Sequence, residues 1–87
     1  MTIDNIKAEL ITLISVLFKE QGFDVDLIEY VDLIDDLGMD SVTFISIVIE
    51  IEAHFNMTVP EDLLLMECFK SVDDIVKIIA NEILSKQ

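Results

Sequence analysis

Cysteine, histidine, glycine and proline are scarce in this chain, and tryptophan is absent. Its 87 residues include one cysteine, one histidine, one proline and two glycines. A single cysteine excludes an internal disulfide, and Cys68 with His54 is too small a set for a zinc cluster. We therefore interpret Cys68 as a small, partly buried apolar side chain. The glycines, at 22 and 38, do not form a glycine-rich phosphate-binding loop.

Basic residues are also few, with Lys+Arg 5 against Asp+Glu 18 and a formal net charge of −13. Such a surface repels nucleic acid phosphates and anionic lipids, so we expect no nucleic acid and no membrane partner, but proteins with basic patches. No apolar run approaches the roughly 18 residues of a membrane span, and MTIDNIKAEL lacks the basic start of a signal peptide. The sequence therefore predicts a soluble, cytoplasmic, monomeric protein.

The apolar residues predict one helical domain over residues 1–87. Their share of 53% is enough for one small core. Apolar residues at steps of three and four predict a first helix to about residue 20, ended by Gly22, and a last helix over 71–85. Ser71 and Asp74 resemble a capping box at its start. Residues 23–40 are typical of a long structured loop, and Pro60 begins a short helix, PEDLLLME.

The middle segment, VTFISIVIEIEAHF, has an ambiguous pattern. Its alternating isoleucines favour a strand, but the chain offers no second strand to pair with it, so we predict a helix. On a helix the apolar residues form two stripes. The first is Phe44, Ile47, Val48, Ile51 and Phe55, and the second is Val42, Ile45 and Ile49. One stripe suffices for a core, so the second is either buried as well or a contact surface for another molecule.

The stretch DDLGMDSVTF, residues 35–44, places a serine at the start of this helix. Asp40 suits the N-cap position, where its carboxylate accepts a hydrogen bond from an amide near Thr43. Ser41 then occupies the first helical position, close to free backbone amides and the positive end of the helix dipole. This position suits a phosphodiester, although a helix start without further function also fits these residues.

Catalysis and metal binding fit the chain less well. His54 lies 13 positions beyond Ser41 on the same predicted helix, roughly 20 Å away, so it cannot act as the base of a serine nucleophile. The G-x-S-x-G pattern of a nucleophile elbow is also missing. The acids at 24, 26, 32, 35 and 36 do not follow the spacing of a calcium-binding loop. We expect no enzyme activity and no metal site.

DDLGMDSVTF, the long apolar helix after it, NMTVPEDLL and CFKSVDDIVKII together resemble the acyl carrier protein family over nearly the whole chain. The resemblance implies a four-helix bundle with a long first loop and a short third helix. It implies that Ser41, in a motif with Gly38 and Asp40, carries 4'-phosphopantetheine from coenzyme A, attached by a phosphopantetheinyl transferase. Acyl groups would form thioesters on this arm. The second stripe, Val42, Ile45 and Ile49, would face partner enzymes.

Departures from the family pattern narrow the type of carrier. Fatty acid carriers typically have acids just after the serine and about a turn later, where this chain has Thr43 and Ser46. Peptidyl carriers usually show a glycine pair, where this chain has Gly38 and Met39. The chain looks more like a discrete carrier of a polyketide or mixed polyketide and nonribosomal peptide pathway. That resemblance implies an acyltransferase or an adenylating or ligase enzyme for loading, and a ketosynthase or condensation enzyme. A carrier of general fatty acid synthesis and an acidic helical adaptor with an unmodified serine stay open as alternatives.

Overall fold

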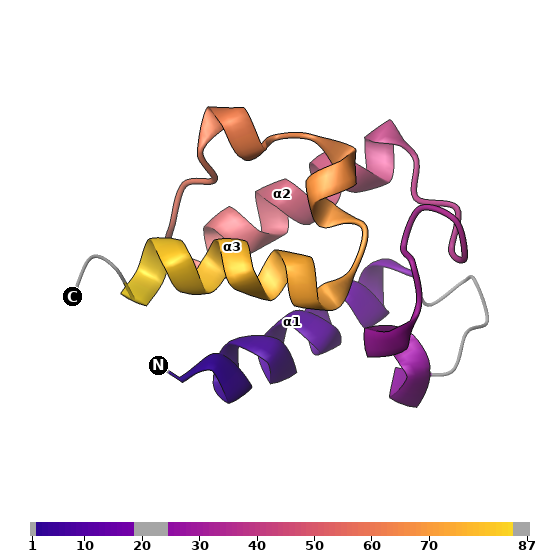
Figure 1. Cartoon of the computed structure of the whole chain (residues 1–87), viewed down its shortest axis with the longest axis horizontal. Helices are drawn as coiled ribbons and strands as arrows, with labels where there is room; N and C mark the ends of the chain where they lie inside the picture. The colour runs from indigo at the N-terminus through magenta and orange to yellow at the C-terminus, as the bar shows by residue number, and fades with distance from the viewer. Residues whose placement is uncertain (1, 19–24, 85–87) are drawn as a thin grey trace.

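The computed structural model of the chain describes residues 2–18 and 25–84 (Figure 1). Within these ranges it contains three α-helices and three short 3₁₀ helices: α1 (Ile3–Leu17), η2 (Val25–Tyr30), α2 (Ser41–Phe55), η3 (Glu61–Leu63), η4 (Met66–Phe69) and α3 (Val72–Leu84). These ranges contain no β-strand. The all-α prediction is confirmed, and the ambiguous middle segment is a helix.

The first helix ends earlier than the pattern predicts. Thr2 caps α1 by accepting a hydrogen bond from the Asn5 amide at 3.2 Å, and the helix ends at Leu17 rather than near residue 20. Phe18 leaves the helical conformation, and its ring is buried in the core. The Phe18 amide donates to the Ile14 carbonyl at 3.0 Å and closes the last turn of α1, whereas Gly22, the predicted stop, lies outside the described residues.

The predicted short helix after Pro60 is present, but as two 3₁₀ helices rather than one continuous helix. Leu65, which lies between η3 and η4, has an extended backbone. Leu63 of η3 and both Met66 and Phe69 of η4 pack on the core. The step of three residues from Met66 to Phe69 suits a 3₁₀ helix, which has three residues per turn.

The α-helices share one core. α1 packs against both α2 and α3. The fully buried side chains of these helices are Ile6, Leu10, Ile14, Ile47, Ile51, Val72, Ile75 and Ile79. Each such side chain contributes about 1.5–3 kcal/mol through burial. Among the described residues no polar or charged residue is buried, so the polar groups available for function lie at the surface.

The start of α3 and the end of α2 are both defined by local backbone features. Ser71 accepts a hydrogen bond from the Asp74 amide at 3.1 Å, as predicted for the start of the last helix, and Asn56 ends α2 in the left-handed conformation. Residue 85, the predicted end of the last helix, lies outside the described ranges. In Figure 1 α2 starts beside the loop of residues 31–40, at the end of the molecule opposite the start of α1 and the end of α3.

Candidate functional site

The N-terminus of α2 is fixed by its cap residue. Asp40 has an extended backbone, and its Oδ1 accepts a hydrogen bond from the Thr43 amide at 2.8 Å. Hydrogen bonds from the backbone and the side chain of Thr43 lower the pKa of the Asp40 carboxyl below its ordinary value. The predicted N-cap role of Asp40 is therefore confirmed, and its carboxylate is charged at neutral pH.

This cap makes helix stability depend on pH. Because the folded-state pKa of Asp40 is lowered, its contribution to stability is present above the ordinary carboxyl pKa of about 4 and is lost as the pH falls through the lowered value. Asparagine also caps helices but does not titrate. We expect the stability advantage of the wild type over Asp40→Asn to shrink as the pH falls from about 6 to about 3. Thermal melting at each pH measures this, and a constant difference would contradict it.

Ser41 is the first residue of α2, and its side chain is exposed. Its hydroxyl makes no hydrogen bond with the residues described by the structure. The helix does not need this hydroxyl as a cap, because Asp40 fills that role. Free amides and the positive end of the helix dipole favour a phosphate here. A phosphodiester on Ser41 fits this position, since it would extend into solvent and leave cap and core undisturbed.

The loop before α2 turns at Gly38, which has a φ of +67° in the left-handed region. The Gly38 amide donates to the Ile34 carbonyl at 3.1 Å, and the Met39 amide donates to the Leu33 carbonyl at 2.8 Å. Met39 is buried in the core directly after the turn. The turn at Gly38 therefore anchors the loop through Met39 and leaves the start of α2 at the surface.

Replacing Gly38 tests this backbone conformation. The Cβ of Gly38→Ala meets no atom within 4 Å, but the alanine must adopt a positive φ. We expect Gly38→Ala to lower the free energy of unfolding by about 1 kcal/mol, and Gly38→Asn to lower it less, because asparagine tolerates the left-handed region. Chemical denaturation measures both changes. Equal losses for the two variants would show that backbone strain is not the cause.

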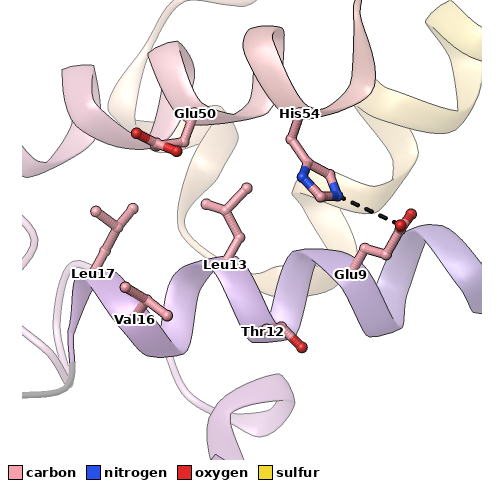
Figure 2. Close-up of a pocket in the computed structure, with 7 residues that line it drawn as sticks. All are labelled: Glu9, Thr12, Leu13, Val16, Leu17, Glu50 and His54. Atoms are coloured by element: carbon pink, nitrogen blue, oxygen red, sulfur yellow. Dashed lines mark ion pairs between the residues drawn. The ribbon is translucent and has the colours of Figure 1, made fainter.

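No histidine is positioned to activate Ser41 as a nucleophile. His54 lies in the last turn of α2, and its Nε2 is 3.5 Å from Oε1 of Glu9 on α1 (Figure 2). The 13 positions between His54 and Ser41 on one helix correspond to about 20 Å. A serine nucleophile needs an adjacent base. The geometry at Ser41 therefore suits a residue that another protein modifies.

Two acids of the loop, Asp32 and Asp36, accept hydrogen bonds from backbone amides. Asp32 Oδ1 accepts from the Ile34 and Asp35 amides, each at 2.9 Å, and Asp36 accepts from the Asp32 amide at 2.8 Å. In the part of the chain that the structure describes, no group of three or more His, Cys, Asp or Glu side chains is placed to hold a metal ion. Asp32 and Asp36 therefore act as turn formers.

The two apolar stripes of α2 differ in burial. Ile47, Ile51 and Phe55 of the first stripe are buried, while Phe44 and Val48 are half-buried against the core. The ring of Phe44 meets that of Phe69 edge to face at 5.2 Å. The second stripe is exposed, with Val42 71%, Ile45 55% and Ile49 58% accessible. The second stripe therefore adds little to the core and forms an apolar surface beside Ser41.

A family model described as a phosphopantetheine attachment site matches residues 8–79. This range spans most of the chain and includes α2, the loop before it and most of α1 and α3. The chain belongs to this phosphopantetheine carrier family. No curated protein matches the carrier.

Membership establishes what the carrier holds. Its cofactor is 4'-phosphopantetheine, attached covalently, and carriers of this family work with a phosphopantetheinyl transferase and with biosynthetic enzymes. The resemblance to carrier proteins is thereby confirmed at the level of the family, and the helices agree with the all-α carrier fold. Within the described ranges no helix of the carrier is long and apolar enough to cross a membrane.

The structure of the carrier also brings together residues whose proximity the sequence pattern did not predict. Glu9 and Leu13 on α1 lie opposite Glu50 and His54 on α2, along a groove between the two helices (Figure 2). These pairs are more than 35 positions apart in the chain. The groove exists because α1 and α2 lie against each other. In the sequence, it was indicated only by two polar residues of α2, Glu50 and His54, that lie one turn apart.

Proposed function

We propose that Ser41 is the residue that carries the phosphopantetheine arm. The main observation behind this proposal is that Ser41 is exposed at the first position of a helix that Asp40 already caps. This position lies within the range matched by the family model. Gly38 supports this role, because its turn places the start of α2 at the surface. The negative phosphodiester would gain from the positive end of the α2 dipole.

In this proposal the carrier is the substrate of its transferase. The Ser41 oxygen forms a bond to the coenzyme A phosphorus that bears pantetheine, and the diphosphate bond at that phosphorus breaks. Adenosine bisphosphate leaves, and the hydroxyl proton passes to a base of the transferase. When bound, the arm supplies a terminal thiol that holds acyl groups as thioesters. The carrier contributes position and exposure, so it needs no catalytic group of its own.

We further propose that Val42, Ile45 and Ile49 form the docking surface for partner enzymes. Ile45 lies one turn and Ile49 two turns beyond Ser41 on α2. An enzyme that acts at Ser41 must approach this part of the helix. Exposed apolar side chains that cluster on one face are typical of protein interaction sites.

The lack of acids at the start of α2 favours a carrier of a polyketide or mixed polyketide and nonribosomal peptide pathway over a carrier of fatty acid synthesis. The first turn of α2 carries no acid, and the first acid of the helix is Glu50. Partners would then include an acyltransferase or an adenylating or ligase enzyme for loading, and a ketosynthase or condensation enzyme. A carrier of general fatty acid synthesis, with acids near the serine, is the alternative. The core shared by α1, α2 and α3 supports a single carrier domain over residues 1–87.

Intact-protein mass spectrometry tests the attachment directly. After incubation with coenzyme A, magnesium and a broad-specificity transferase, we expect the protein to gain the mass of one phosphopantetheine group. Fragmentation should place the added mass on the peptide that contains Ser41. An unchanged mass would favour the acidic helical adaptor, and an added mass on another peptide would move the attachment site.

A further inference from the structure

Lys70 is bonded to the loop that leads to Ser41. The Leu33 amide donates to the Lys70 carbonyl at 2.6 Å, and the Leu33 carbonyl accepts from the Met39 amide at 2.8 Å. Met39 lies two positions before Ser41. The segment between η4 and α3 therefore runs beside the loop before α2 (Figure 1).

The residue before Lys70 contacts the helix that Ser41 begins. The ring of Phe69 meets that of Phe44, three positions beyond Ser41, edge to face at 5.2 Å. Phe69 is fully buried, so the end of η4 is packed against the first turn of α2. Lys70 follows directly, and its backbone therefore lies close to both the loop before Ser41 and the first turn after it.

The Lys70 side chain is exposed, and its charge is not compensated. Its ammonium makes no ion pair or hydrogen bond with any residue that the structure describes. The other lysines within the described ranges lie elsewhere, since Lys7 pairs with Asp73 at 3.4 Å and Lys77 lines a groove between α1 and α3. Lys70 is therefore the described lysine that lies next to the proposed attachment position.

A phosphodiester on Ser41 would enter an acidic part of the surface. Asp35, Asp36 and Asp40 precede Ser41 in the same loop, and the chain has a net charge of −13. Repulsion among like charges is unfavourable, and the free amides of α2 offset only part of it. An ammonium on a flexible four-carbon stem is a common partner of phosphate in proteins. Lys70 is placed to offset the charge that the arm adds.

We propose that Lys70 holds the base of the phosphopantetheine arm through a charge-assisted hydrogen bond from its ammonium to the phosphodiester on Ser41. This inference rests on the proposed function, in which Ser41 carries the arm. Such a bond restrains the arm at its phosphate and leaves the thiol end free to move between enzymes.

Melting temperatures of the unmodified and the phosphopantetheine-bearing protein test this bond. The change in melting temperature on modification should be more favourable by about 2–4 °C in the wild type than in Lys70→Gln, as expected for an exposed ion pair in a domain of this size. Lys70→Arg should keep the difference, because arginine keeps the charge. The difference should vanish in about 1 M sodium chloride, which screens exposed ion pairs.

The phosphorus-31 resonance of the modified protein gives a second readout, which a purely structural role of Lys70 would not move. We expect this resonance to differ between the wild type and Lys70→Gln. Lys77→Gln is the matched control, because Lys77 is also exposed but lies on α3 beside the groove with α1. This variant should match the wild type in both measurements.

Three results would overturn the role of Lys70. They are the same melting change on modification in the wild type and in Lys70→Gln, an unmoved phosphorus-31 resonance in Lys70→Gln, and equal effects of Lys77→Gln. A wild-type chain that gains no phosphopantetheine mass would instead overturn the proposed function on which this role rests. The two failures are therefore distinguishable.

Discussion

Ser41→Ala should abolish the gain of phosphopantetheine mass and leave the fold unchanged. The hydroxyl is the proposed attachment point, whereas the helix is capped by Asp40 through its bond to the Thr43 amide. An exposed side chain at the first helical position contributes little to stability, so the melting temperature should stay close to that of the wild type. Mass spectrometry after the transferase reaction and circular dichroism give the two measurements.

Ser46→Ala is the matched control for this variant. Ser46 lies on α2 as well, and its hydroxyl donates to the Val42 carbonyl at 3.1 Å. We expect this variant to gain the full mass. Modification of Ser41→Ala would place the arm elsewhere, and loss of helical signal in that variant would mean that the serine has a structural role.

Ile51→Ala should lower the free energy of unfolding by roughly 3 kcal/mol, a loss typical of a large aliphatic side chain removed from a core. Ile51 is fully buried. Ile49 lies two positions earlier on the same helix and is exposed, so Ile49→Gln should change the free energy of unfolding by less than about 1 kcal/mol. Chemical denaturation of both variants measures the contrast. Similar losses would show that α2 is buried on all sides in solution.

The exposed stripe should matter for partner enzymes. Ile45→Gln should lower kcat/KM of the transferase for the carrier by about fivefold or more, since loss of a central apolar anchor commonly costs over 1 kcal/mol of binding. Leu65→Gln is the matched control, because Leu65 is exposed to nearly the same extent but lies outside α2. An equal fall in kcat/KM for both variants would refute a docking role specific to α2.

The helix at the centre of the site was predictable although its propensity pointed to a strand. Alternating isoleucines such as Ile45 and Ile47 suit a strand, but a strand needs a partner and this sequence offers none. Asp40 could be assigned as the cap because its chemistry is local, requiring only an amide three positions away. Features that depend on residues close in the sequence could therefore be predicted.

Features that depend on tertiary packing could not be predicted from the sequence. In the segment after Pro60, Leu63 and Phe69 both pack on the core, although the backbone is extended at Leu65 between them. The facing of Glu9 and His54 arises only once α1 lies against α2. No local pattern encodes which helix faces meet, so the groove could be found only from the three-dimensional arrangement.

The loop before Ser41 is tied to the residue that leads into α3. The Leu33 amide donates to the Lys70 carbonyl at 2.6 Å, and the Leu33 side chain is fully buried. This amide can exchange its hydrogen with water only when the loop separates from Lys70. Its exchange should therefore be slow and should accelerate together with that of the Ile75 amide, which bonds to the Ser71 carbonyl one residue further on. The base of the arm and the start of α3 would then open as one cooperative unit.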